Sequence, residues 1–436
     1  QDVRVRMGGT QNVRTVPGVA LHRFRHVPSP RLHQLIPMTW PRPVSQNQGM
    51  GGGVDAHAAD SSRAAPGPDG ASPGAGQPYS GSVPRRRHTA RLSRTGLAAA
   101  VTSAVVMTGA LHPAAVAVPG TGVDTSTALG FTTSPRPTAP PPADRGTPQI
   151  LRVQSVEGRK VLADVWSPAM DEAVPTFLLL PASPSPAPLL LLLNGVGGGE
   201  DHVGWAYHTD YQDFFADKHV LVASPEGGRF SLYTDWQRPD PVLGVNRWQT
   251  FLDHELPLAL SRGYALNNTR GVIGVSMSGG PALALAATSP HHYAAAASLS
   301  GMPEVSTPFG RAAMTAMVAR GGGNIHNAWG GHDDPAWLVN DPSWNVERLR
   351  GTAVYLASAP GNPGPNDQPD LGSATFVIGA PTELASDLGT RHMAAALRAG
   401  GIPFTYDRYD NGAPTFALFE RELRDSWRVV GPALGA

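Results

Sequence analysis

The stretch GVIGVSMSGGPALALAATSP (residues 271–290) decides the fold. Its apolar, partly β-branched run leads to Ser276, and an Ala/Leu-rich segment typical of a helix follows at once. Gly274 and Ser278 flank the serine, and small residues are needed there because larger side chains would collide with the backbone of a sharp turn. The pattern predicts a nucleophile elbow at Ser276, although position 278 more often has glycine. The alternative is that a chain rich in Gly, Ala and Ser forms the pattern by chance.

Apolar runs alternate with segments of helical period on both sides of this stretch. Strands are predicted at residues 188–194, 219–224, 270–275, 294–300 and 352–358. Helices are predicted at residues 210–217, 248–260, 281–288 and 383–398. This alternation predicts an α/β fold, with a mostly parallel sheet and helices on both faces.

Composition excludes several classes of function. The 436 residues contain 34 basic (Lys and Arg) and 34 acidic side chains, so no net charge favours binding to nucleic acid. Cysteine is absent, which rules out disulfides, thiol nucleophiles and cysteine metal sites. His254-Glu255 lacks a second histidine at zinc-helix spacing, and Asp333-Asp334 has too few acidic partners for a calcium loop. We therefore expect no metal and no cofactor.

The first third of the chain is predicted to lie outside the folded domain. Residues 1–84 show no sustained periodicity, and residues 51–83 among them are rich in Gly, Ala, Pro and Ser, so residues 1–84 are expected to be disordered. Residues 85–117 combine a basic region, an apolar run and an A-x-A site, which together predict a secretory signal peptide cleaved after Ala117. A membrane anchor is the alternative, but the run is short and contains hydroxyl residues.

A signal peptide belongs at the start of a chain, so residues 1–84 are hypothesised not to be translated in the natural protein. Residues 118–148 form a predicted Pro/Thr-rich linker, and the folded domain is expected to span residues 149–436. The mature protein is thus predicted to be secreted to the cell envelope, without a stable membrane span.

Seven ordered motifs resemble those of one family, the mycolyltransferases of the antigen 85 type. They are SPAM (167–170), LLNG (192–195), GW (204–205), SLYTDW (231–236), WQTFLDHELP (248–257), the elbow, and WG with DDPAWLVNDP (329–342). The resemblance implies a secreted enzyme of the α/β-hydrolase fold. It also implies transfer of a mycoloyl group from one trehalose monomycolate to a second, or to a cell-wall glycan, by a Ser–Glu–His triad.

The resemblance assigns the catalytic roles. The nucleophile would be Ser276 and the acid Glu383, at the start of a predicted helix. The oxyanion hole would be the backbone N–H groups of Val196 and Met277, which do not depend on side-chain identity.

Substrate-binding residues follow from the same motifs. They would be Asn194, Trp205 and Trp236. Gly197 stands where the family often has an arginine that contacts trehalose, so trehalose specificity is not implied.

One departure affects the chemistry. The family's histidine lies in a G-T-H-S-W motif, and the corresponding stretch here begins GAPTF (residues 412–416), with Pro414 in its place. Proline has no side-chain nitrogen to take the serine proton. Of the remaining histidines, His392 lies on the helix that follows Glu383, and His326 and His332 lie in a Gly-rich segment.

Two functional hypotheses follow. The first is an acyltransferase or esterase that acts on acyl-sugars through an acyl-enzyme on Ser276, with an unidentified base. The second is a catalytically inactive homologue that binds envelope glycolipid or glycan. The missing base favours the second hypothesis. A single-base sequence error at Pro414 is a third reading, but Phe416 in place of the motif's tryptophan argues for genuine drift.

Overall fold

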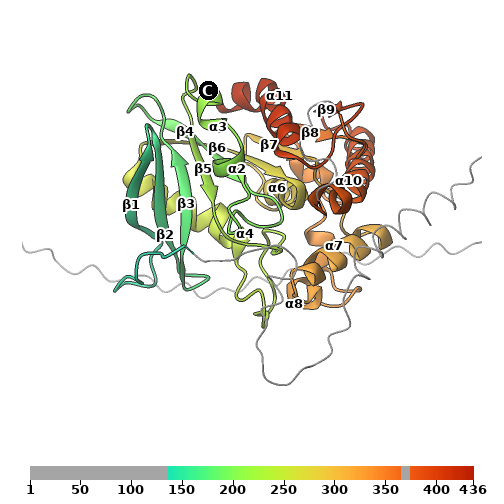
Figure 1. Ribbon diagram of the computed structural model, residues 1–436, viewed down its shortest axis with the longest axis horizontal. Coiled ribbons are helices and arrows are strands. Elements are labelled where there is room, and N and C mark those ends of the chain that lie inside the picture. The colour runs from blue at the N-terminus through green and yellow to red at the C-terminus, as the bar shows by residue number, and fades with distance from the viewer. Residues whose placement is uncertain (1–135, 365–373) are drawn as a thin grey trace, which may run out of the picture. The chain divides into compact units, whose positions relative to one another are not determined.

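A computed structural model describes residues 136–364 and 374–436 (Figure 1). The predicted disordered region, the predicted signal peptide and most of the predicted linker lie outside these residues. Within the described ranges, none of the helices has the length and apolar character needed to cross a bilayer.

One mixed sheet forms the centre of the described domain. Its nine strands lie in the order β1-β2-β3-β5-β4-β6-β7-β8-β9, and Figure 1 shows β1 at one edge and β9 at the other. The first three strands and β5 pair antiparallel, and the pairs from β5 through β4 to β9 are parallel. The strands are β1 (Gln149–Glu157), β2 (Lys160–Ser167), β3 (Glu172–Leu179), β4 (Ala187–Leu193), β5 (Leu221–Pro225), β6 (Leu266–Val275), β7 (Ala295–Leu299), β8 (Ala353–Ser358) and β9 (Phe404–Arg408).

The longer helices cover the two faces of this sheet. They are α5 (Leu256–Gly263), α6 (Gly279–Thr288), α7 (Pro308–Arg320), α10 (Ala374–Ala399) and α11 (Phe416–Leu434). Shorter helical turns are α2 (Trp205–His208), α3 (Tyr211–Phe214), α4 (Trp248–Thr250), α8 (Ile325–Trp329), α9 (Ala336–Val339), the π-helical η2 (Phe251–Glu255), and the 3₁₀ turns η3 (Ser276–Ser278) and η4 (Val346–Leu349). Figure 1 shows α7 and α8 (orange) below α6 and away from the sheet.

Alternation along the central strands produces two separate cores. In β4, Leu189 and Leu191 face the core that also contains side chains of α5, α6 and α10. Leu190 and Leu192 face the opposite core, which contains side chains of α3 and α11. Successive side chains of a strand point to opposite faces, so a strand buried on both faces is apolar throughout. The predicted α/β-hydrolase class, with helices on both faces, is confirmed.

All five predicted strands are present, within a few residues at each end. The three antiparallel strands β1–β3, the edge strand β9 and the C-terminal helix α11 were not predicted. The prediction that Glu383 begins a helix is wrong, because α10 starts at Ala374 and continues through Pro381. Glu383 therefore lies in the interior of α10 rather than at its first turn.

Part of the predicted linker packs against the domain. The backbone N–H of Ala139 donates to Asp164 at 2.8 Å, and Arg136 forms an ion pair with the buried Glu226 at 3.3 Å. The indole N–H of Trp166 donates to the carbonyl of Arg145 at 3.0 Å. The packed region therefore begins earlier than the predicted boundary at residue 149.

Candidate active site

Ser276 lies at the turn between β6 and α6, in the geometry of a nucleophile elbow. Its φ of 53° is in the left-handed region, which non-glycine residues rarely adopt. A Cβ at Gly274 would come within 2.1 Å of the carbonyl oxygen of Ser278, so the turn closes only with glycine there. Backbone strain of this kind costs about 1–3 kcal/mol and is retained where surrounding structure imposes it.

Ser278 replaces the more usual glycine because its hydroxyl supports the turn. The hydroxyl accepts from the backbone N–H of Val275 at 2.8 Å and lies 3.0 Å from the carbonyl oxygen of the same residue. Ser278 is fully buried, so these contacts satisfy groups that water cannot reach. The departure at position 278 thus stabilises the elbow.

The predicted oxyanion turn lies next to the serine. A Cβ built on Gly195 would be 3.8 Å from the Cβ of Ser276, which places residues 194–196 beside the elbow. The carbonyl of Val196 accepts from Phe230 N–H at 3.0 Å, which holds the turn against the loop after β5. Val196 and Met277 thus belong to the two segments that flank Ser276. Their assignment as oxyanion donors stays a prediction.

Asn194 has a structural role in this turn. It is 3% exposed; its amide N–H donates to the carbonyl of Pro225 at 2.9 Å, and its carbonyl accepts from Trp205 N–H at 3.2 Å. Gly197 also serves packing, since a Cβ there would lie 2.2 Å from the carboxylate of Asp201. A larger residue at this position would therefore require the carboxylate of Asp201 to move.

The two predicted substrate-binding tryptophans lie in the core. Trp205 and Trp236 are 0% and 1% exposed. Their indole N–H groups donate to the carbonyls of Leu193 and Ser231, at 2.9 and 2.8 Å. Because both rings are buried and their N–H groups are already hydrogen-bonded, neither ring is placed to contact a substrate in this conformation.

Glu383 is held by a polar cluster that sequence reasoning missed. The hydroxyl of Ser300, just after β7, lies 2.5 Å from Oε1 of Glu383 and 2.9 Å from Oε1 of Glu422 on α11. Glu383 also accepts from the backbone N–H of Ala359 at 3.4 Å. Both carboxyl groups are buried, at 2% and 0% exposure. The cluster therefore joins the predicted acid to the C-terminal helix.

The protonation of this cluster follows from counting hydrogens. The single hydroxyl hydrogen of Ser300 serves one carboxylate, so the second short contact requires a proton on a carboxyl group. Burial, and secondarily the neighbouring Glu383, raise the pKa of Glu422 well above its ordinary value. We therefore expect the shared proton on Glu422, which then donates to the hydroxyl oxygen of Ser300, while the hydroxyl hydrogen of Ser300 is donated to Glu383.

The segment that replaces the histidine motif is packed. Thr415 caps α11, because its hydroxyl accepts from the backbone N–H of Leu418 at 3.3 Å. The ring of Phe416 contacts Trp205 edge-on and stacks on His208, at centroid distances of 5.9 and 5.2 Å. His208, which no sequence pattern indicated, is thus an imidazole beside Phe416, two residues after Pro414.

The other histidines of interest are engaged elsewhere. His392 contacts Glu304 at 2.5 Å, and His326 contacts the carbonyl of Gly330 at 2.7 Å. His332 lies 5.8 Å from His326 between ring centroids. Within the described residues, no imidazole is hydrogen-bonded to Ser276, and no three His, Asp or Glu side chains are grouped so as to hold a metal ion.

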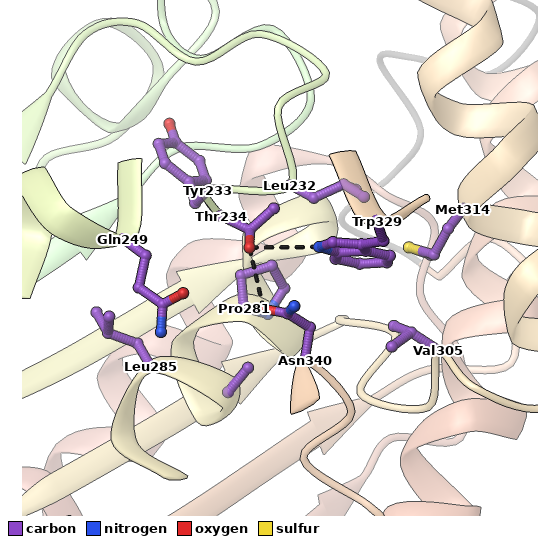
Figure 2. Close-up of a pocket in the computed structure, with 11 residues that line it drawn as sticks. Leu232, Tyr233, Thr234, Gln249, Pro281, Leu285, Val305, Met314, Trp329 and Asn340 are labelled. Atoms are coloured by element: carbon purple, nitrogen blue, oxygen red, sulfur yellow. Dashed lines mark hydrogen bonds between the residues drawn. The ribbon is translucent and has the colours of Figure 1, made fainter. Parts of the chain in front are cut away.

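A small apolar pocket lies beside α6, the helix that follows the elbow. It is formed by the loop at Leu232–Thr234 with residues of α6, α7 and α8 (Figure 2). The hydroxyl of Thr234 bonds to Asn340 at 3.0 Å and accepts from Trp329 at 3.4 Å, as the dashed lines show. The volume of the pocket, about 20 Å³, is near that needed for one water molecule, so an acyl chain would fit only if the walls moved.

An α/β-hydrolase fold is defined by the sheet order and by the strained serine at the turn after β6. The Esterase family model matches residues 167–394, more than half of the chain, and the chain belongs to this family, in its antigen 85-type branch. The diacylglycerol acyltransferase/mycolyltransferase Ag85A of Mycobacterium ulcerans is 32% identical over 257 residues, covering 57% of this chain and 75% of the relative. Ag85B of Mycolicibacterium smegmatis is 33% identical over 258 residues, covering 55% and 76%.

Solved structures agree with this assignment. The crystal structure of Mycobacterium tuberculosis MPT51 has a TM-score of 0.52 at 27% identity, covering 62% of this chain and 96% of that one. An S-formylglutathione hydrolase from Agrobacterium tumefaciens has the same TM-score at 14% identity, covering 66% and 100%. The second likeness concerns the fold alone.

Proposed function

We propose that this protein binds acyl-sugars of the cell envelope at the inherited esterase cleft and turns them over slowly or not at all. The observation that carries the proposal is the state of the predicted triad. Position 414 is a proline, and the carboxylate of Glu383 accepts from Ser300 within the cluster that contains Glu422. A serine without a base is a poor nucleophile, and loss of one triad member costs several orders of magnitude in rate.

The ligand class is proposed from the relatives. The matched proteins are named mycolyltransferases, so an acyl-sugar such as a trehalose monoester is the expected ligand. Secretion through the predicted signal peptide of residues 85–117 would place the protein with such lipids and with cell-wall glycan. The drift at Gly197 and the burial of Asn194 support recognition that differs in detail from that of the enzymes.

The test is binding of a fluorescent trehalose monoester, with mass spectrometry of the ester after incubation. We expect saturable binding with the ester intact. Gly195→Leu would fill the space in front of Ser276, because a Cβ there meets only ordinary contacts, and should weaken binding at least tenfold (about 1.4 kcal/mol). The control is Gly331→Leu, where a Cβ meets open space.

Equal binding by both variants would place the ligand elsewhere. Rapid, Ser276-dependent cleavage of the ester would overturn the proposal.

A second candidate function, a working esterase or acyltransferase, is favoured by one observation. Ser276 keeps the strained φ of 53°, although a simple turn from strand to helix does not require a residue in the left-handed region. In that case a base outside the motif would act through an acyl-enzyme on Ser276, and His208 would be the first imidazole to test, because it stacks on Phe416. His208→Ala would then abolish ester cleavage, whereas in a binding protein it would change neither the folding nor the negligible turnover.

A further inference from the structure

A polar cavity lies at the end of the sheet opposite to Ser276. Its walls come from the first half of β6, the turn before β7 and the turn before β8. Arg270 of this cavity and Ser276 are six residues apart on one extended segment, which corresponds to about 20 Å. The volume is about 320 Å³, against about 20 Å³ for the apolar pocket beside α6. The cavity is thus separate from the candidate active site and larger than a bare anion.

The cavity wall is polar and contains two arginines. Arg270 and Arg350 line it together with His291 and His292, and none of the described lining residues is a carboxylate. Glu347 and Asp253, just outside the lining, pair with Arg350 and His292, so among the described residues the positive charge of the wall that no carboxylate balances is that of Arg270. Concave surfaces lined by one sign of charge concentrate ligands of the other sign.

Arg270 lacks a carboxylate partner in the described part of the chain. Its guanidinium is half-buried and donates to the backbone carbonyl of Asp253 at 2.9 Å, and it forms none of the ion pairs found among the described residues. A guanidinium has five N–H donors in a planar fork that suits phosphate or carboxylate. Most of its donors therefore remain for a ligand.

The other basic and polar side chains of the cavity differ in how they are held. Arg350 is paired with Glu347 at 2.6 Å, but both side chains are more than half exposed, so this ion pair is weak and exchanges readily. His292 is paired with the buried Asp253 at 3.0 Å. Asn268, which is exposed and also lines the cavity, offers an amide that can donate to or accept from a hydroxyl.

We propose that this cavity binds a phosphorylated saccharide, with the phosphate at Arg270 and Arg350 and the sugar hydroxyls at Asn268. The phosphate matches the two guanidinium groups, and the volume exceeds that of a phosphate alone. The polar wall suits a sugar better than an alkyl chain. This site lies outside the esterase cleft and does not depend on the function proposed for it.

The experiment is calorimetric titration of the full chain with glucose 6-phosphate, inorganic phosphate and glucose as probes. We expect glucose 6-phosphate to bind more tightly than inorganic phosphate, glucose to bind undetectably, and the affinity to fall with added salt. Arg270→Gln should weaken binding at least tenfold and Arg350→Gln several-fold, because each removes charge-assisted hydrogen bonds. Ser276→Ala should leave the affinity unchanged.

The matched control is Arg262→Gln, since Arg262 likewise donates to a backbone carbonyl, that of Pro148, and lies outside the cavity. An equal loss in Arg262→Gln and Arg270→Gln would show a general charge effect and overturn the site. Equal affinity for inorganic phosphate and glucose 6-phosphate would overturn the saccharide. If Arg270→Gln fails to fold, the exposed Arg350→Gln variant decides alone, and unchanged binding in it contradicts the proposal.

Discussion

The elbow at residues 274–279 and the segment at residues 412–416 have diverged to different extents, although both belong to one predicted catalytic site. At the elbow, glycine is retained where a side chain would collide, and the one departure, Ser278, adds hydrogen bonds to the turn. In the second segment the resemblance predicts a histidine base where this chain has Pro414, and the structure shows the helix cap at Thr415 and the ring contacts of Phe416. On the proposed function, the geometry that positions a nucleophile is kept and the residue that would activate it is lost.

This difference separates packing from chemistry. The elbow joins a central strand to a helix buried in the core, so changing it disturbs the whole sheet. A histidine in a loop contributes mainly through proton transfer, and the fold does not depend on it. The polar cluster of Ser300, Glu383 and Glu422 shows how the interior adjusts, because a buried carboxylate needs hydrogen-bond donors from some source.

The largest expected effect is on the elbow. Gly274→Ala places a Cβ about 2 Å from a backbone oxygen, so we expect a loss of about 3 kcal/mol or more in the free energy of unfolding. Urea denaturation measures it. The control Gly331→Ala, in open space, should stay within about 0.5 kcal/mol. Similar losses in the two variants would remove the claim that sterics hold the elbow.

The next effect concerns the lost base. Pro414→His should raise the rate of ester hydrolysis at least tenfold, and adding Ser300→Ala should raise it further, because Glu383 is then released to orient the imidazole. Hydrolysis of a short-chain nitrophenyl ester measures both. Folded variants without any gain would mean that the cleft, and not only the base, has diverged.

A third test concerns the residue that stabilises the elbow. Ser278→Ala leaves the buried N–H of Val275 without its acceptor, which should lower the free energy of unfolding by about 1–3 kcal/mol. Ser261→Ala removes an exposed hydroxyl bonded to a carbonyl and should cost less than about 0.5 kcal/mol. If the two costs were equal, Ser278 would be tolerated at the elbow without supporting it.

The last test concerns the pH dependence of the buried acid pair. In the folded protein Glu422 keeps its proton above its ordinary pKa of 4.5, whereas the unfolded chain releases it. The unfolded state then binds fewer protons, so this residue lowers stability by about 1.4 kcal/mol per pH unit from that pKa up to the raised one. Glu422→Gln should remove this slope in urea denaturation curves recorded between pH 5 and 8. An unchanged slope would mean that Glu422 is ionised in the folded state.

The sequence was sufficient for the parts of the fold that local pattern determines. The apolar runs of β4 and β6 and the Gly-x-Ser pattern at Ser276 indicate buried strands and a tight turn on their own. The antiparallel strand β1 was missed because its residues are half-buried or exposed, which leaves a weak apolar signal. The strands β2 and β3 are mostly buried, but Asp164 and Pro175 interrupt their apolar runs.

The site was predicted less completely. Ser300 and Glu422 come from segments far from Glu383 in sequence, and only tertiary packing brings the three together. Asn194, Trp205 and Trp236 were predicted to bind substrate, but their side chains are buried and hydrogen-bonded within the domain. Sequence motifs do not distinguish a residue that lines a cleft from one that supports it.

The most direct test of the central claim is labelling of Ser276 by a fluorophosphonate probe, followed by intact-mass measurement. If the elbow is intact and no base activates Ser276, we expect the folded protein to gain no probe mass under conditions that fully label an active serine hydrolase. Rapid addition of one probe, lost in Ser276→Ala, would contradict the account and show that another group activates this serine.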